Sequence, residues 1–343
     1  MHTPRIEIRD GGPRQPNLGR PVLVTGGAGF IGAHLTVALL RSGHQVTVVD
    51  DYSTGDPARL RAVEGHPQLR VIQADIGEPI PVAGDVGQIY HLAAPAAPTR
   101  YQADPIGTIR TCVQGTGNVL DLATSEGASV VFSSTSEVYG DPDIVPQPET
   151  YTGNVNPIGL RSPYDEGKRC AEALCFAYAR QHGVDIKVAR LFNTYGPGMS
   201  LDGRVMATFI WQALHGWPLT IHGRGQQRRA FCFVEDTVDA LMRLMRTPAG
   251  VNGPINIGHP SSITVLDLAA RVSAAVGVPL HTLFKARPSD DPGHREPDIQ
   301  LARDLLRWEP TVDLDAGLAL TVADLRARAS DLSRAPGPGP MYR

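Results

Sequence analysis

The sequence predicts an α/β protein in which a doubly wound parallel sheet is joined to a second, smaller lobe. Two observations predict this fold. Short runs of β-branched and other apolar residues alternate with helical patterns, and after about residue 190 this alternation gives way to proline- and glycine-rich segments. The predicted strands lie at residues 21–25, 45–50, 69–72, 88–92, 129–134 and 186–190, and the longest predicted helices at 106–125 and 164–182.

The same pattern predicts how the chain is divided. Residues 251–257 contain one more apolar run, which we expect to return to the main sheet after part of the lobe has been built. Both chain ends are polar or rich in proline and glycine, a composition typical of flexible segments. The expected parts are a leader (1–19), a sheet domain (20–195 with about 233–258), a lobe (about 196–232 with 259–328, including a helix near 205–215) and a tail (329–343).

Composition excludes several classes of function. The 343 residues are enough for two packed regions, and 42% of them are hydrophobic. The formal net charge of −3 gives no basic field of the kind that binds a phosphate backbone, so nucleic acid is not expected as a partner. No apolar run approaches the roughly 20 residues of a membrane span, and residues 1–19 lack the core of a signal peptide. We therefore expect a cytoplasmic protein without a membrane partner.

Cysteine usage is typical of the same compartment. No two of the four cysteines form a Cys-x-x-Cys pair of the kind that binds zinc or carries redox chemistry. We predict no metal site. We expect four reduced, buried thiols, at Cys112, Cys170, Cys175 and Cys232.

A glycine pattern lies directly between the first predicted strand and the first predicted helix. Gly26, Gly29 and Gly32 have the spacing G-x-x-G-x-x-G. In this context the first glycine permits a tight turn, the second lets the backbone approach a pyrophosphate, and the third lets the helix pack on the strand. Asp50 ends the second strand, where a carboxylate binds the ribose hydroxyls and repels a 2′-phosphate. The pattern therefore predicts NAD rather than NADP.

Other residues at the carboxyl ends of the strands are expected around the same cofactor. Asp75 and Ile76 follow the third strand and would flank the adenine, although Asp75 taken alone is more typical of a turn cap. Small residues after the fourth strand leave room for the nicotinamide riboside. Besides the three glycines and Asp50, the residues expected at the cofactor are Phe30, Ile31, Asp51, Tyr52, Thr54, Gly55, Asp75, Ile76, Leu92, Ala94, Thr111, Ser133, Tyr164, Lys168 and Thr194.

A candidate catalytic set follows further along the chain. Tyr164 and Lys168 stand four residues apart, on one face of a predicted helix. A nearby ammonium favours the phenolate, which would bring the tyrosine towards the range where it acts as a base. Thr135 ends an intervening strand. We expect hydroxyl, phenol and ammonium to form a proton relay beside a hydride acceptor.

These motifs, in this order, resemble the extended short-chain dehydrogenase/reductase family over nearly all of residues 20–310. The resemblance implies a Rossmann domain that binds NAD and a C-terminal lobe that binds a nucleotide sugar. Within that family the chain is similar to the UDP-glucuronate decarboxylases (UDP-xylose synthases). The similarity lies in eight segments, at residues 94–98 with Tyr101, 135–142, 156–159, 164–169, 192–197, 202–205, 227–231 and 290–299.

The resemblance implies an enzyme that oxidises C4 of UDP-glucuronate with bound NAD, loses the C6 carboxylate as CO2 and re-reduces C4 to give UDP-xylose. Thr135, Tyr164 and Lys168 match the catalytic set of the family, and Glu137 matches its catalytic glutamate. Arg295 matches the arginine that seats the C6 carboxylate, a task suited to a bidentate guanidinium. The residues expected at the substrate are Tyr101, Glu137, Asn193, Arg204, Arg229 and Arg295, with Arg224 or Arg228 as alternatives to Arg229.

Three other functions are compared on the same residues. A 4,6-dehydratase carries an Asp-Glu pair after the threonine, whereas this chain has Ser136 and Glu137. A 4-epimerase needs neither Glu137 nor Arg295, although some epimerases accept uronates. A non-enzymatic NAD-binding regulatory protein would not need the intact catalytic set. UDP and dTDP both stay open, as does the escape of NADH from a 4-keto intermediate.

The resemblance also implies a homodimer, formed when two helices from each sheet domain pack into a four-helix bundle. In this chain these would be the helices at 106–125 and 164–182. Packing within one monomer would explain the apolar residues on them equally well. The candidate contact residues are Val113, Leu120, Leu174 and Tyr178.

Overall fold

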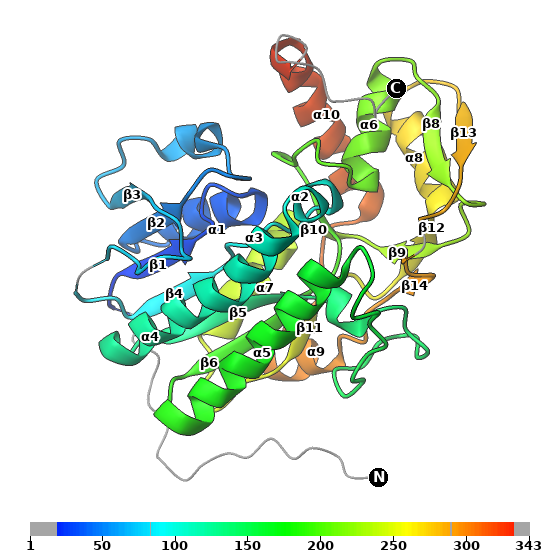
Figure 1. Cartoon of the computed structure of the whole chain (residues 1–343). Coiled ribbons are helices and arrows are strands. Elements are labelled where there is room, and N and C mark those ends of the chain that lie inside the picture. Colours follow the sequence, from blue (N-terminus) through cyan, green and yellow to red (C-terminus); the bar gives the residue numbers. More distant parts are fainter. Residues whose placement is uncertain (1–18, 83, 289, 333–343) are drawn as a thin grey trace.

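The computed structural model describes residues 19–82, 84–288 and 290–332, and a seven-stranded parallel sheet lies at the centre of this part of the chain (Figure 1). All six strands predicted from the sequence are present, each within one residue of its expected bounds. Every neighbouring pair in the sheet is parallel. In sheet order the strands are β11 (Ile255–Ile257), β6 (Ile186–Leu191), β5 (Ser129–Thr135), β4 (Gln88–His91), β1 (Val22–Thr25), β2 (Val46–Asp50) and β3 (Leu69–Gln73).

The returning strand is present but shorter than expected. β11 begins at Ile255 rather than at residue 251, because Gly253 has a left-handed φ of +80° and Pro254 has no N–H to donate to a neighbouring strand. It pairs with β6 and forms one edge of the sheet. The chain therefore returns to the main sheet after building part of the lobe.

Each face of the sheet has its own apolar core. Alternate residues of β1 face opposite sides, so that Val22 and Val24 pack in one core and Leu23 in the other. Because helices cover both faces, the central strands are buried on both sides, and their middle residues are mainly apolar. One face is covered by α1 (Phe30–Arg41), α7 (Val234–Met245) and α9 (Gln300–Leu306), and the other by α4 (Thr116–Glu126) and α5 (Ser162–His182).

The helix predicted at residues 106–125 is helical throughout but contains a widened turn. It consists of α3 (Pro105–Arg110), a π-helical turn over Thr111–Gly115, and α4. The widened turn lies where a Cβ on Gly115 would overlap the side chain of Ile76. The second long helix, α5, starts two residues before the predicted position and ends at the predicted residue, 182.

The smaller lobe has its own core, built around Phe209, Leu219 and Leu268. Figure 1 shows α6, α8, β8 and β13 gathered at the upper right, apart from the main sheet. The sequence predicted only α6 among these elements. The lobe contains α6 (Val205–Leu214), β8 (Leu219–His222), β9 (Arg228–Ala230), β12 (Ser262–Thr264), α8 (Val265–Val276), β13 (Thr282–Lys285), β14 (His294–Arg295) and α10 (Leu314–Leu332).

Most of the predicted leader and tail lies outside the described residues. Only Gly19 of the leader is described, and α10 occupies the first residues of the predicted tail. All four thiols are free, but Cys170 is exposed, contrary to the prediction, because it lies beside the buried stripe of α5 rather than on it. No helix among the described residues has the length and apolarity to cross a bilayer.

The packing at Gly32 gives the first test of this fold. A Cβ at this position would overlap the carbonyl oxygen of Gly26 and crowd Gly27, so we expect Gly32→Ala to lower the free energy of unfolding by about 1–3 kcal/mol. Gly117→Ala is the matched control, because a Cβ there meets no atom within 4 Å and alanine is favoured in a helix. Denaturant unfolding of both variants checks this, and equal midpoints would refute close packing at Gly32.

Candidate active site

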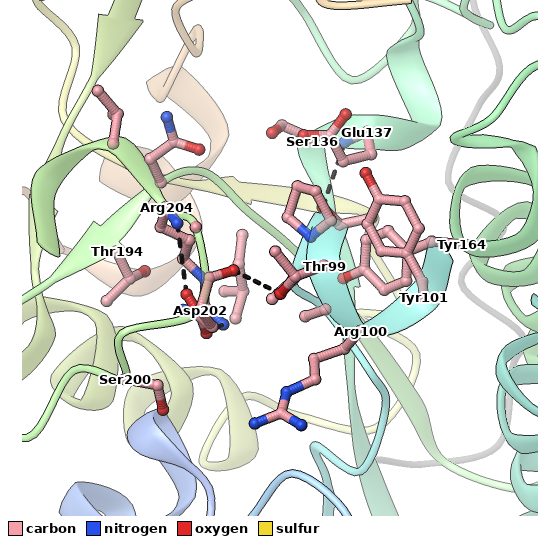
Figure 2. Close-up of a pocket in the computed structure, with 18 of the residues that line it drawn as sticks. Thr99, Arg100, Tyr101, Ser136, Glu137, Tyr164, Thr194, Ser200, Asp202 and Arg204 are labelled. Atoms are coloured by element: carbon pink, nitrogen blue, oxygen red, sulfur yellow. Dashed lines mark hydrogen bonds and ion pairs between the residues drawn. The ribbon is translucent and has the colours of Figure 1, made fainter. Parts of the chain in front are cut away.

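A cavity of about 710 Å³ lies at the carboxyl ends of the sheet strands, with walls from the sheet domain and from the lobe (Figure 2). It is lined by the first turn of α1, the ends of β5 and β6, the start of α5 and several lobe residues. Most of the residues predicted from the sequence line it. These are Gly26, Gly29, Phe30, Ile31, Gly32, Thr54, Leu92, Ala94, Tyr101, Ser133, Thr135, Glu137, Tyr164, Lys168, Asn193, Thr194, Arg204 and Arg229.

The glycine turn leaves the first turn of α1 facing the cavity. Gly26 has a φ of +72°, and a Cβ on it would overlap the backbone of Ala93. Gly29 is the N-cap of α1 and supplies no capping side chain. Backbone N–H groups at a helix start bind anions, and here they lie beside a wall without side-chain bulk. This cradle fits a pyrophosphate, and the contact of Gly26, Gly29 and Gly32 with the cofactor stays a prediction.

Asp50 holds the glycine turn rather than lining the cavity. Its carboxylate accepts hydrogen bonds from the backbone N–H groups of Ala28 and Tyr52, each at 2.9 Å. Burial raises its pKa, while these two hydrogen bonds lower it. Gly55 is needed next to it, because a Cβ there would overlap the carboxylate. Contact between Asp50 and the ribose hydroxyls stays a prediction.

Several residues predicted at the cofactor have structural partners instead of a place on the cavity wall. Asp75 accepts a hydrogen bond from Gly77 N at 2.8 Å and so caps a turn, which was the other interpretation of this residue besides contact with the adenine. Ile76 is buried in the core between β3 and α4, and Asp51 accepts from the backbone and hydroxyl of Ser53. The predicted residues that do not line the cavity are Asp50, Asp51, Tyr52, Gly55, Asp75, Ile76, Thr111 and Arg295.

The structure brings Thr135 and Tyr164 together inside the cavity. Thr135 ends β5 and Tyr164 lies in the first turn of α5. Burial raises the pKa of the Tyr164 hydroxyl, while a hydrogen bond with the Thr135 hydroxyl lowers it. The ring of Tyr164 stacks on that of Tyr101, with centroids 5.5 Å apart and planes 4° from parallel (Figure 2). The buried Tyr101 hydroxyl has no hydrogen-bond partner among the described residues and so is available to a ligand.

Lys168 lies one turn after Tyr164, as predicted, but its ammonium is engaged elsewhere. Nζ donates a hydrogen bond to the carbonyl oxygen of Ser133 at 2.8 Å and lies 4.6 Å from the centre of the Phe132 ring. Burial lowers the pKa of Lys168. The predicted lowering of the Tyr164 pKa by Lys168 is therefore not found in this structure, where burial of the phenol dominates.

Glu137 lies between two arginines in the 3₁₀ turn that follows β5. Its Oε2 is 2.6 Å from Nη2 of Arg161 and 2.8 Å from Nη2 of Arg295. Burial alone would raise the pKa of this carboxyl, but the charges of Arg295 and Arg161 outweigh burial and lower the pKa to about 2. Glu137 is therefore an ionised carboxylate at neutral pH.

The two arginines at Glu137 differ in their access to the cavity. Arg295, on β14, is 2% exposed, donates to the carbonyl oxygen of Gly140 as well as to Glu137, and does not line the cavity. Arg161 does line it. Sequence reasoning missed Arg161, although its place three residues before Tyr164, about one helical turn, was an available signal.

The arginines predicted at the diphosphate lie on the lobe side of the cavity. Arg204 pairs with Asp202 at 3.1 Å, an ion pair visible in Figure 2, and Arg229 pairs with Asp291 at 2.9 Å. Neither Arg224 nor Arg228 lines the cavity, and Arg228 instead bonds to Ser262, so the geometry favours Arg229 among the three alternatives.

Comparison with known proteins shows the family to which this chain belongs. The model of the NAD-dependent epimerase/dehydratase family matches residues 22–258. The chain belongs to this family. UDP-glucuronic acid decarboxylase 3 of Arabidopsis thaliana is 49% identical over 316 residues, 92% of this chain and 91% of the relative. UDP-glucuronic acid decarboxylase 1 of Danio rerio is 48% identical over 302 residues, 88% of this chain and 71% of that protein.

Solved structures of the epimerase/dehydratase family agree on the fold. A UDP-glucuronic acid 4-epimerase from Bacillus cereus, in complex with UDP-4-deoxy-4-fluoro-glucuronic acid and NAD, aligns with a TM-score of 0.82 and 28% identity over 90% of this chain and 99% of that one. The predicted Rossmann sheet with a smaller C-terminal lobe is confirmed, as is the resemblance to extended short-chain dehydrogenases.

Proposed function

We propose that this protein is a UDP-glucuronate decarboxylase that forms UDP-xylose with bound NAD. One observation carries the proposal: Thr135, Tyr164 and an arginine-paired Glu137 line the same cavity, in a chain about half identical to UDP-glucuronic acid decarboxylases. The hydroxyl of Thr135 and the phenol of Tyr164 can assist oxidation of the C4 alcohol of a sugar. The carboxylate of Glu137, held by arginines, can assist decarboxylation and proton transfer at the neighbouring carbon, C5. Each of these parts has a task in the reaction.

The cavity fits NAD and a nucleotide sugar together. The cradle at Gly26, Gly29 and Gly32 would hold the pyrophosphate of NAD, and Lys168 would hold the nicotinamide ribose. NAD, when bound, accepts the hydride from C4 of the sugar and later returns it, and its cationic ring favours the phenolate. Arg204 and Arg229 would bind the diphosphate of the sugar nucleotide through charge-assisted hydrogen bonds.

The residues of the chain handle the protons of the first and last steps. Tyr164 Oη takes the proton of the C4 hydroxyl as the C4 hydrogen leaves with its electron pair, and Thr135 orients that hydroxyl. C4 becomes a ketone, which makes the C6 carboxylate a β-keto acid. In the last step C4 is reduced, and Tyr164 returns the proton to the C4 oxygen.

Decarboxylation lies between these steps. The bond between C5 and C6 breaks, its electron pair passes into an enolate on the C4 oxygen, and CO2 leaves. A proton then adds to C5, delivered with the help of Glu137, and the product is a pentose. The alternative dehydration needs an acid at the position of Ser136, which a hydroxyl does not supply.

A test with C6-labelled substrate separates the candidate reactions. Incubated with UDP-glucuronate labelled at C6 and catalytic NAD, the protein is expected to release labelled CO2, with UDP-xylose identified by NMR. A six-carbon product that retains its carboxylate would contradict decarboxylation and indicate a 4-epimerase. No turnover, with NAD still bound, would indicate a binding protein.

We further propose a cytoplasmic homodimer that packs through α3, α4 and α5. Ile106 and Ile109 on α3 are 64% and 45% exposed and offer apolar contact area. Leu120 is no longer a candidate for the dimer contact, because it is fully buried in the core of its own monomer. Val113, Leu174 and Tyr178 are partly buried and stay candidates.

A further inference from the structure

In the cluster around Glu137, two guanidinium groups share one closely paired carboxylate. The guanidinium groups of Arg161 and Arg295 both contact a single carboxylate oxygen, Glu137 Oε2. The other nearby carboxyl, Asp165, lies 3.9 Å from Arg161 Nε. Burial and the charge of Glu137 raise the pKa of Asp165, which favours its neutral form, so Asp165 balances the guanidinium charges less than Glu137 does. A second carboxylate would complete the cluster.

Only one of the two arginines is in a position to receive that carboxylate. The Arg295 side chain is 3% exposed and is held by both Gly140 and Glu137, whereas the Arg161 side chain is 18% exposed and lines the cavity. Nε is buried without a hydrogen-bond partner among the described residues in both Arg161 and Arg295, so what distinguishes Arg161 is that its side chain lines the cavity. Buried donors of charged groups gain substantially from a partner.

The position of Arg161 matches the chemistry at the sugar. It immediately precedes α5 and lies about one turn before Tyr164, the residue that would take the proton from C4. Its partner Glu137 stands two residues after Thr135, which shares that task, and the backbone N–H of Glu137 donates a hydrogen bond to the Thr135 hydroxyl at 3.2 Å. A sugar whose C4 hydroxyl reaches Tyr164 and Thr135 therefore has its C5 substituent within the neighbourhood of Glu137 and Arg161.

We propose that Arg161 binds the C6 carboxylate of the substrate, exchanging part of its contact with Glu137 for it, and so selects a uronate over a neutral sugar. This inference rests on the proposed function. Arg295 stays on Glu137 and holds it in place during the exchange. Glu137 then has one arginine in contact instead of two, which returns its carboxyl towards a state that can carry a proton when the substrate is bound.

Ligand binding, rather than turnover, tests this inference. We expect Arg161→Met in the NAD-loaded protein to raise the Kd for UDP-glucuronate about 10- to 100-fold, the range for a lost hydrogen bond to a charged group. The Kd for UDP-xylose, which has no C6, is expected to change less than about 3-fold. Calorimetric titration of both ligands gives the two values, and an equal loss for both would overturn the proposal.

Two further variants keep the test decisive. Arg100→Met is the matched control, because Arg100 also lines the cavity but its side chain points away from Glu137 and Tyr164 in Figure 2. It should leave the ratio of the two Kd values unchanged. Arg161→Lys keeps the charge without the guanidinium fork and should retain part of the preference for the uronate, and it carries the test if the methionine variant fails to fold.

Failure of this inference and failure of the proposed function give different results. If the wild-type protein prefers UDP-glucuronate over UDP-xylose in titration but releases no CO2, the reaction is wrong while the role of Arg161 is still measured. If CO2 is released and Arg161→Met binds both ligands as the wild type does, the reaction stands and the carboxylate contact assigned to Arg161 is wrong.

Discussion

Tyr164→Phe is expected to lower kcat for CO2 release by about 10²- to 10⁴-fold, the usual contribution of a positioned acid or base. The variant loses only the hydroxyl that takes the C4 proton. The ring, its stacking on Tyr101 and the position of α5 are retained, so NAD content should not change. Stopped-flow absorbance of NADH in a single turnover reports oxidation at C4 directly.

Tyr101→Phe is the matched control for this prediction, because it removes the second hydroxyl of the same ring stack. The Tyr101 hydroxyl has no partner among the described residues, so its loss should leave the fold intact and act mainly on KM. If both variants lost kcat equally, the hydroxyl of Tyr164 would have no special task. If Tyr164→Phe kept wild-type turnover, another group would have to take the C4 proton.

The sheet was predictable from the sequence because its local pattern is strong. Most strands of the sheet are short, largely apolar and buried, although the edge strand β3 is partly exposed, and the glycine turn between β1 and α1 has a fixed spacing. The lobe was not predictable in the same way. Its strands have two to four residues, too few for a periodic pattern, and they form through distant pairings such as β9 with both β12 and β14.

The candidate site was predicted in its residues more than in its geometry. Thr135, Glu137 and Tyr164 line one cavity, as the motifs indicated. A motif does not reveal that β14, which carries Arg295, pairs with β9. In this position Arg295 is buried beside Glu137 and does not line the cavity. Arg161 was missed because it follows a long irregular segment, and only its distance from Tyr164 marked it.

Glu137→Gln is expected to suppress CO2 release by about 10²- to 10⁴-fold while NAD stays bound. Glutamine keeps the size of the side chain and can still accept hydrogen bonds from Arg161 and Arg295, but it neither carries a proton nor balances the two cations. The measurement is labelled CO2 release together with the NAD content of the purified protein. Loss of NAD in this variant would contradict the place assigned to Glu137, because no predicted cofactor contact depends on it.

The same variant has an expected effect on stability whose pH dependence identifies its cause. Removing the partner of buried charges costs about 3–5 kcal/mol, whereas Glu166→Gln, which breaks an exposed pair with Arg169, should cost at most about 1 kcal/mol. The arginines lower the pKa of Glu137 from 4.5 to about 2, so its ionised form stabilises the fold above pH 4.5. That stabilisation is lost as the pH falls from about 4.5 to 2. Denaturant unfolding of wild type and variant should therefore converge over this window, and a difference that persisted at its lower end would show that the arginines do not hold Glu137 through its charge.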